Sequence, residues 1–138
     1  MTQRHCKIWT LLLILGAVSK TFSQDVSVPN PGLEKLLGTW VWVKSTGGMA
    51  GKTTTPKITG HTQSIEFTKD GVEKIFRDGK QESEIKFTVT EVKHKSETEY
   101  LMTIIDRDLQ SIKFHGPDVF FIHDKSPDGF DSTYIRKK

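Results

Sequence analysis

The chain has 138 residues, of which 35 % are hydrophobic, 27 % are charged and 9 % are aromatic, and its formal net charge is +3. This length suits one domain, and the hydrophobic share is too low for a protein that crosses a membrane many times. Eight Phe and three Trp residues are too many for a chain that never folds. We therefore expect one small soluble globular domain.

Residues 1–23 have the features of a secretory signal peptide. Basic residues precede an uncharged apolar run over 8–18, and small or polar residues follow it. This run of 11 residues is too short to span a bilayer, which takes about 20 residues. We expect cleavage after Ser23, with cleavage after Ser19 as the second choice and an uncleaved anchor as a further alternative. Cys6 lies before the run, so it is not the acylated cysteine of a bacterial lipoprotein.

Cleavage changes the charge and the cysteine content of the chain. The signal peptide carries Arg4, Lys7 and Lys20 and no acidic residue, so the mature chain has 17 basic and 17 acidic residues. A neutral chain lacks the cationic surplus of a nucleic-acid-binding protein. Without cysteine, the mature chain has no disulfide scaffold and no thiolate metal site. We therefore expect a bacterial protein, secreted or periplasmic, with no nucleic-acid partner and no membrane span after cleavage.

Short β-prone runs separated by turn residues follow a polar leader over 24–32. One helical turn is predicted at 31–37, with proline near its start. Asp70-Gly71 and Asp78-Gly79 are hairpin signals. The predicted strands cover 40–44, 64–68, 72–76, 84–89, 100–105, 109–114, 119–123 and 130–136, and a Gly- and Thr-rich loop covers 45–61.

These strands predict an all-β fold over residues 33–138, a small antiparallel up-and-down β-barrel of about eight strands. A parallel βαβ arrangement is disfavoured because no long segment has helical periodicity. A closed barrel hides the edge strands, although a two-sheet sandwich fits the same alternation. Phe120 and Phe121 must face opposite sides of their strand. The alternation points these side chains inward: Ile65, Phe67, Ile85, Phe87 and Val89.

Motifs at both ends of the domain carry a family resemblance. Gly38-Thr39-Trp40 follows the helical turn and opens the first strand, which resembles the G-x-W motif of lipocalins. Arg136 ends the last strand, where that family places an arginine. The resemblance implies that the Arg136 guanidinium packs over Trp40, so that Gly38, Trp40 and Arg136 close one end of the barrel. Arginine stacks well on an indole ring.

The order of the motifs is similar to that of small lipocalin-like domain proteins of Bacteroidetes-type bacteria. A signal peptide precedes the G-x-W motif, and a Gly-rich loop ends in Thr55-Pro56. An F-x-x-D-G hairpin at 67–71 and a final Y-x-R follow. The resemblance covers about residues 33–136. It implies a lipocalin-like barrel whose long first loop, 45–61, is a lid over the open end.

Catalytic and cofactor motifs are not found. Residues 46–53 resemble a phosphate-binding loop, but they start with Thr46 and continue into Thr-Thr-Pro, which does not begin the required helix. The histidines lack helical metal-ligand spacing, and His115 and His123, which could meet across a hairpin, are more simply solvated or core residues. Residues 106–108, Asp-Arg-Asp, are interpreted as a solvated turn. We expect no enzymatic activity, no metal and no cofactor.

The predicted function is an exported, non-catalytic binding protein that holds a small apolar or amphipathic ligand in the barrel. The alternative is a protein–protein interaction or inhibitor module with a filled barrel, which an exposed apolar patch around Phe120, Phe121 or the 45–61 loop would favour. An enzyme would need a polar cluster inside the barrel, such as His115 and His123 with an acid. The candidate ligand-binding residues, for which core packing is the alternative, are Trp42, Phe67, Phe87, Tyr100 and Met102.

Overall fold

The computed structural model describes residues 30–104, 107 and 109–138. The predicted signal peptide, the leader up to residue 29, and residues 105, 106 and 108 lie outside the described residues. The elements are, in chain order, α1 (Pro31–Leu36), β1 (Gly38–Gly47), β2 (Lys52–Thr54), α2 (Pro56–Thr59), β3 (Gln63–Phe67), β4 (Val72–Arg77), β5 (Lys80–Lys93), β6 (Thr98–Ile104), β7 (Gln110–Phe114), β8 (Val119–Asp124) and β9 (Phe130–Arg136).

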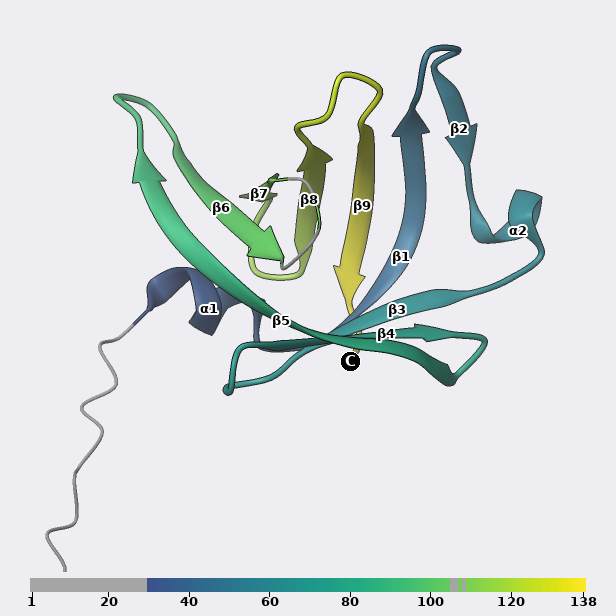
Figure 1. The fold of residues 1–138 in the computed structure, drawn as a ribbon, viewed down its shortest axis with the longest axis horizontal. Helices are drawn as coiled ribbons and strands as arrows, with labels where there is room; N and C mark the ends of the chain where they lie inside the picture. Colours follow the sequence, from purple (N-terminus) through teal and green to yellow (C-terminus); the bar gives the residue numbers. More distant parts are fainter. Residues whose placement is uncertain (1–29, 105–106, 108) are drawn as a thin grey trace, which may run out of the picture.

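The strands form a closed antiparallel β-barrel, which confirms the predicted fold class and rules out the two-sheet sandwich. β3 to β9 pair in sequence order, and β1 pairs with both β3 and β9. The β1–β9 seam runs from Trp40 opposite Arg136 to Gly47 opposite Phe130. β2 is an extra strand. It pairs with residues 45–47 of β1, beyond the residues of β1 that pair with β3. Figure 1 shows the strands curving around a common centre.

The up-and-down path places the connections alternately at the two ends of the barrel. We call one end the closed end, because helix α1, the β3–β4, β5–β6 and β7–β8 connections and the end of β9 lie there. We call the other the open end, which carries the β1–β2, β4–β5, β6–β7 and β8–β9 connections. Helix α1 lies beside β5 (Figure 1).

The N-terminal helix forms as predicted and ends at Leu36. The side chain of Asn30 accepts a hydrogen bond from the Leu33 amide at 3.1 Å, and Pro31 occupies the first turn. Gly32 allows α1 to approach the barrel, because a Cβ atom there would lie 2.6 Å from Val89 Cγ1. The helix thus starts two residues before the domain boundary expected at Leu33.

The segment 45–61 is more regular than the predicted loop, and this part of the prediction was wrong. β1 continues to Gly47 because Ser45, Thr46 and Gly47 pair with β2 on one side and with β9 on the other. Thr55 caps the short helix α2, and Gly60 ends it in the left-handed conformation (φ 74°). Long-range pairing with β9, which no local pattern reveals, extends the strand.

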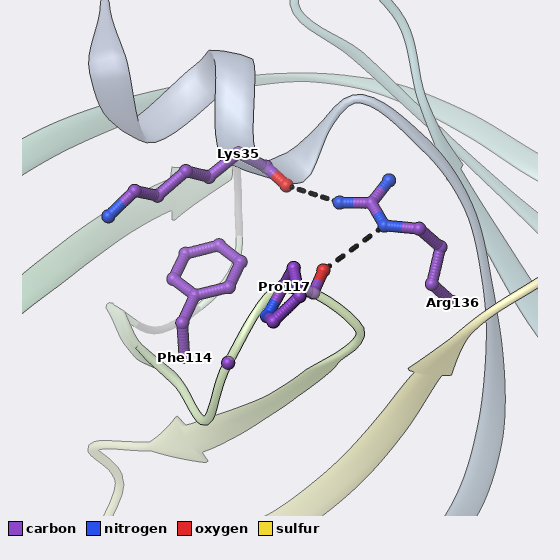
Figure 2. A pocket seen from close by; sticks show the side chains of 5 residues that line it. Lys35, Phe114, Pro117 and Arg136 are labelled. Carbon is purple, nitrogen blue, oxygen red and sulfur yellow. Dashed lines mark hydrogen bonds between the residues drawn. The ribbon is translucent and has the colours of Figure 1, made fainter.

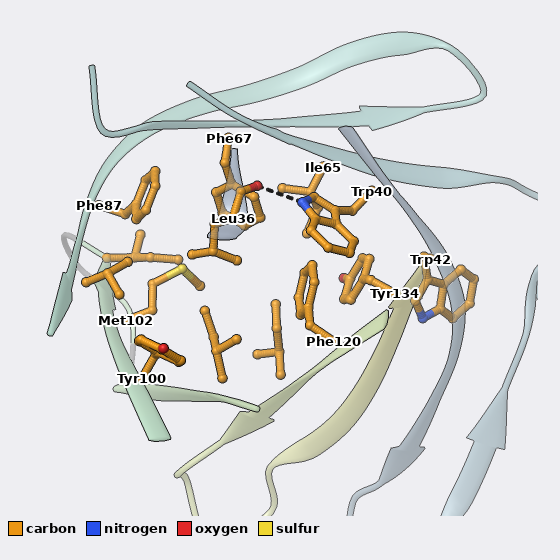
Figure 3. Close-up of a cluster of buried hydrophobic side chains, with 14 residues drawn as sticks. Leu36, Trp40, Trp42, Ile65, Phe67, Phe87, Tyr100, Met102, Phe120 and Tyr134 are labelled. Carbon is orange, nitrogen blue, oxygen red and sulfur yellow. Dashed lines mark hydrogen bonds between the residues drawn. The ribbon is translucent and has the colours of Figure 1, made fainter. Parts of the chain in front are cut away.

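The core lies inside the barrel and follows the predicted alternation (Figure 3). Phe120 is fully buried, whereas its neighbour Phe121 is 39 % exposed, so the two rings do face opposite sides. The Phe120 ring stacks on Tyr134 and meets the edge of Trp40 at centroid distances of 5.1 and 4.6 Å. The five side chains predicted to point inward all belong to this core or pack against it: Ile65, Phe67, Ile85, Phe87 and Val89.

Candidate functional site

The closed end is fastened by Arg136, the residue expected to close the barrel. Its Cζ lies 4.1 Å from the centroid of the buried Trp40 ring. Its guanidinium donates to the carbonyls of Leu37 (2.8 Å), Lys35 (2.9 Å) and Pro117 (3.2 Å). Trp40 Nε1 donates to the Leu36 carbonyl at 2.7 Å. Two elements distant in sequence, α1 and the β7–β8 turn, are thereby tied to the last strand.

A hollow of about 430 Å³ lies outside this closed end (Figure 2). Lys35 and Arg136 line it together with Phe114 and the Gly116-Pro117 turn. The donors of Arg136 are already bound to backbone carbonyls, and Lys35 Nζ donates to Tyr100 Oη at 2.9 Å. We therefore interpret these cations as part of the barrel closure.

The five residues predicted to contact a ligand all belong to the buried core. Trp42 lies just beyond the last β1–β3 pair, donates from Nε1 to Ser45 Oγ at 2.8 Å and stacks on His61. None of the five lines the hollow at the closed end or the other pockets described below. The structure places all five in one core cluster, and their ligand contacts stay a prediction: Trp42, Phe67, Phe87, Tyr100 and Met102.

A smaller pocket lies at the mouth of the barrel, at the open end, and we call it the chamber. Its volume is about 190 Å³. This equals about six molecules of liquid water at roughly 30 Å³ each. Its walls come from β3, β4, β7, β8 and β9 and from the β6–β7 loop, with both polar and apolar side chains: Gln63, Ile65, Glu73, Ile75, Arg107, Gln110, Ile122, Asp124, Phe130, Ser132 and Tyr134.

Glu73 is the unusual residue of the chamber. It is 2 % exposed, and in the described part of the molecule its Oε2 has no hydrogen-bond partner. Its Oε1 lies 3.8 Å from Nη1 of Arg107, an ion pair without a hydrogen bond. Burial raises the pKa of Glu73 above its ordinary value, and the positive charge of Arg107 lowers it in part. A carboxylate is therefore held inside the barrel with unused acceptor capacity.

Tyr134 provides a second polar group on the chamber wall. Burial raises the pKa of its hydroxyl strongly, and the negative charge of Glu73 adds to the rise. The phenol therefore stays neutral over the ordinary pH range. Nearby, Ser132 Oγ forms a 2.7 Å hydrogen bond with Ser45 Oγ. The chamber thus combines two carboxylates, of Glu73 and Asp124, with a phenol, a hydroxyl and the side chains of three isoleucines.

The analysis of the sequence missed Glu73 and Arg107. Glu73 shares a strand face with Ile75, so a charged residue occupied a position that the alternation assigns to the core. A charged residue at a core-facing position of the strand was the sequence signal that could have identified Glu73. Arg107 was interpreted as part of a solvated turn, and its side chain is 37 % exposed. Its approach to Glu73 is a long-range contact with β4, which short motifs do not encode.

The histidines do not form the internal cluster that an enzyme was expected to need. His123 Nδ1 bonds to Asp131 Oδ1, both of them mostly exposed. His115 lies in the β7–β8 connection at the opposite, closed end. In residues 30–104, 107 and 109–138, no three His, Cys, Asp or Glu side chains converge as metal ligands would. The polar residues that line the chamber include Glu73, Arg107 and Tyr134 instead.

Comparisons of the chain with protein-family models, curated proteins and solved structures gave no match. Neither helix of the described segments has the length and hydrophobicity required to cross a bilayer.

Proposed function

We propose that this protein is an exported, lipocalin-like binding protein that is not an enzyme and holds a small amphipathic molecule in its chamber. The observation that carries the proposal is the buried carboxylate of Glu73, whose Oε2 has no partner in the described molecule. Buried polar atoms are nearly always satisfied, so an unpaired oxygen on a residue that lines a pocket points to a missing partner. A ligand with a hydrogen-bond donor supplies that partner.

Apolar and polar residues of the chamber wall have different roles in binding. Ile65, Ile75 and Ile122 offer apolar surface, and burial there is worth about 25 cal/mol per Å² before the cost of association. Glu73 and Tyr134 fix the orientation of the polar end. The small volume, about 190 Å³, favours a molecule with one ring or a short chain over a long lipid. This refines the expected apolar or amphipathic ligand toward the amphipathic class.

Export is the second part of the proposal, and it rests on the pattern of residues 1–23. We predict that the protein recovered from the envelope or the medium of its host begins at Gln24. Intact-mass measurement checks the prediction directly. A chain that keeps residues 1–23 and stays with the cytoplasm would contradict export.

Native mass spectrometry of the protein purified from its own host tests ligand binding. We expect an adduct that disappears when the protein is denatured. Ile75→Trp should abolish the adduct, because Ile75 lines the chamber and the larger side chain fills it. Ile135→Trp is the matched control, because Ile135 is 44 % exposed and is not among the residues that line the chamber.

Two results would count against binding in the chamber. One is a bare mass under gentle conditions for the unmodified protein. The other is an adduct that survives in Ile75→Trp while the circular dichroism spectrum shows an intact fold, because the ligand would then lie elsewhere on the protein.

A protein-interaction or inhibitor role is the second candidate. It is favoured by Phe121, which is exposed on β8 and lines two hollows in the described surface. One of these hollows, of about 400 Å³, is also lined by Glu99, Lys113 and His123. Single exposed aromatic side chains are common on protein surfaces, so this observation weighs less than the unpaired carboxylate in the chamber.

A further inference from the structure

We infer that the chamber selects a small organic monocation, a compact amine whose ammonium group binds Glu73 and whose short apolar body lies against the isoleucines. This inference rests on the proposed function, because it assigns the ligand class of the same chamber. The charges, the geometry of the ion pair and the shape of the walls support it in turn.

The charges that line the chamber leave an excess of one negative charge. Glu73 and Asp124 contribute two carboxylates, and Arg107 contributes one guanidinium. A bound monocation makes this set neutral, whereas a carboxylate or phosphate would add to the negative excess. Because the Glu73 side chain is almost fully buried, its electrostatic interaction with a neighbouring charge is stronger than it would be at the surface.

Arg107 satisfies Glu73 incompletely. The distance of 3.8 Å from Nη1 to Oε1 is too long for a hydrogen bond, and Oε2 faces no donor in the described molecule. An ammonium group has three donors on a compact head, so one such group can reach a carboxylate oxygen that the planar guanidinium does not. Arg107 is partly exposed on the β6–β7 loop, which lets its side chain turn toward solvent when a ligand enters.

The other walls suit the body of such an amine. Phe130 and Tyr134 present aromatic rings, which attract cations, and the isoleucines contact carbon atoms. The volume of about 190 Å³ leaves room for one ring or a short chain. A long polyamine would be too large for the chamber, and its several positive charges would outnumber the one excess negative charge of the chamber.

Three probes that share one carbon skeleton test the charge class: benzylamine, benzyl alcohol and benzoate. Their binding is followed in the purified protein by two-dimensional NMR titration, using the resonances of Ile65, Ile75 and Ile122. We expect benzylamine to bind at least about tenfold more tightly than benzyl alcohol, because its hydrogen bond to Glu73 is assisted by charge. Benzoate should bind most weakly of the three.

Two variants change the charge of the chamber in opposite directions. Glu73→Gln should weaken benzylamine binding by about tenfold or more and leave benzyl alcohol nearly unchanged. Arg107→Gln should tighten benzylamine binding severalfold, because the competing cation is gone, and should weaken benzoate binding. Glu66→Gln is the matched control, because Glu66 alternates with the buried Ile65 and Phe67 on β3 and so faces away from the chamber.

Each contrary outcome has a distinct meaning. Tighter binding of benzyl alcohol or benzoate than of benzylamine would overturn the charge inference and leave the chamber as a binding site. Unchanged benzylamine affinity in both Glu73→Gln and Arg107→Gln would also overturn it. If no probe shifts the chamber resonances, the inference fails, and the adduct measurement with Ile75→Trp decides separately whether the chamber binds anything.

Discussion

Trp40→Ala is expected to lower the free energy of unfolding by about 3–5 kcal/mol, the usual effect of deleting a large aromatic side chain from a core. Trp40 is fully buried, lies under the Arg136 guanidinium and meets the edge of Phe120. The change also removes the donor to the Leu36 carbonyl. Because small domains have only about 5–15 kcal/mol in total, the loss should be plain in urea unfolding followed by circular dichroism.

Two further variants serve as a comparison and a control for Trp40→Ala. Trp40→Phe keeps part of the ring contacts and loses only the indole donor and some volume, so its effect should be smaller. Val43→Ala changes an exposed side chain on the same strand and should stay within about 0.5 kcal/mol of the parent protein. A loss below about 1 kcal/mol for Trp40→Ala would mean that the closed end does not depend on this ring.

Glu73→Gln is expected to stabilise the protein without ligand by about 1 kcal/mol or more near neutral pH, because a neutral amide avoids the larger desolvation cost of a buried charge without a full partner. Burial raises the pKa of Glu73 in the folded state above its ordinary value of 4.5. Ionisation of Glu73 therefore opposes folding, and stability falls as the pH rises through the folded-state pKa. Below the ordinary pKa the carboxyl is protonated in both states, so the gain from the substitution should vanish there.

Urea unfolding at about pH 4 and about pH 7.5 measures this difference. Arg107, Asp124 and Tyr134 also line the chamber and are common to both proteins, so the difference isolates the Glu73 charge. A hydrogen bond from Thr62 lowers the pKa of Asp78, and one from Ser111 lowers the pKa of Glu99. The stability that these two carboxylates contribute to the folded protein is lost as the pH falls. This loss is equal in both proteins. A gain that does not change with pH, or a loss at neutral pH, would contradict the prediction.

The two predictions concern opposite ends of the barrel, and the sequence was informative to different degrees about each. At the closed end, Gly38, Trp40 and Arg136 stand in short motifs at fixed places of the first and last strands. The inward positions of Ile65 and Phe67 followed from local alternation. Local patterns suffice for such features because side-chain direction in a strand depends only on parity.

The chamber could not be predicted in the same way. Its key contact joins Glu73 on β4 to Arg107 on the β6–β7 loop, and the two residues are brought together only when the barrel closes. The extension of β1 to Gly47 likewise depends on pairing with β9. Glu73 shares the inner face of β4 with Ile75, but we did not predict this, and alternation does not tell whether an inner position meets packed side chains or empty space.

The seam between the first and last strands also sets the order in which the molecule can assemble. β1 pairs with β9, and Arg136 lies only two residues from the end of the 138-residue sequence. The backbone amide of Lys137 also bonds to the Thr39 carbonyl at 2.9 Å. A nascent chain therefore lacks the strand that closes the barrel until β9 has been made, and until then β1 stays unpaired along one edge. Because long-range pairing of this kind forms slowly, we expect the barrel to close late in folding.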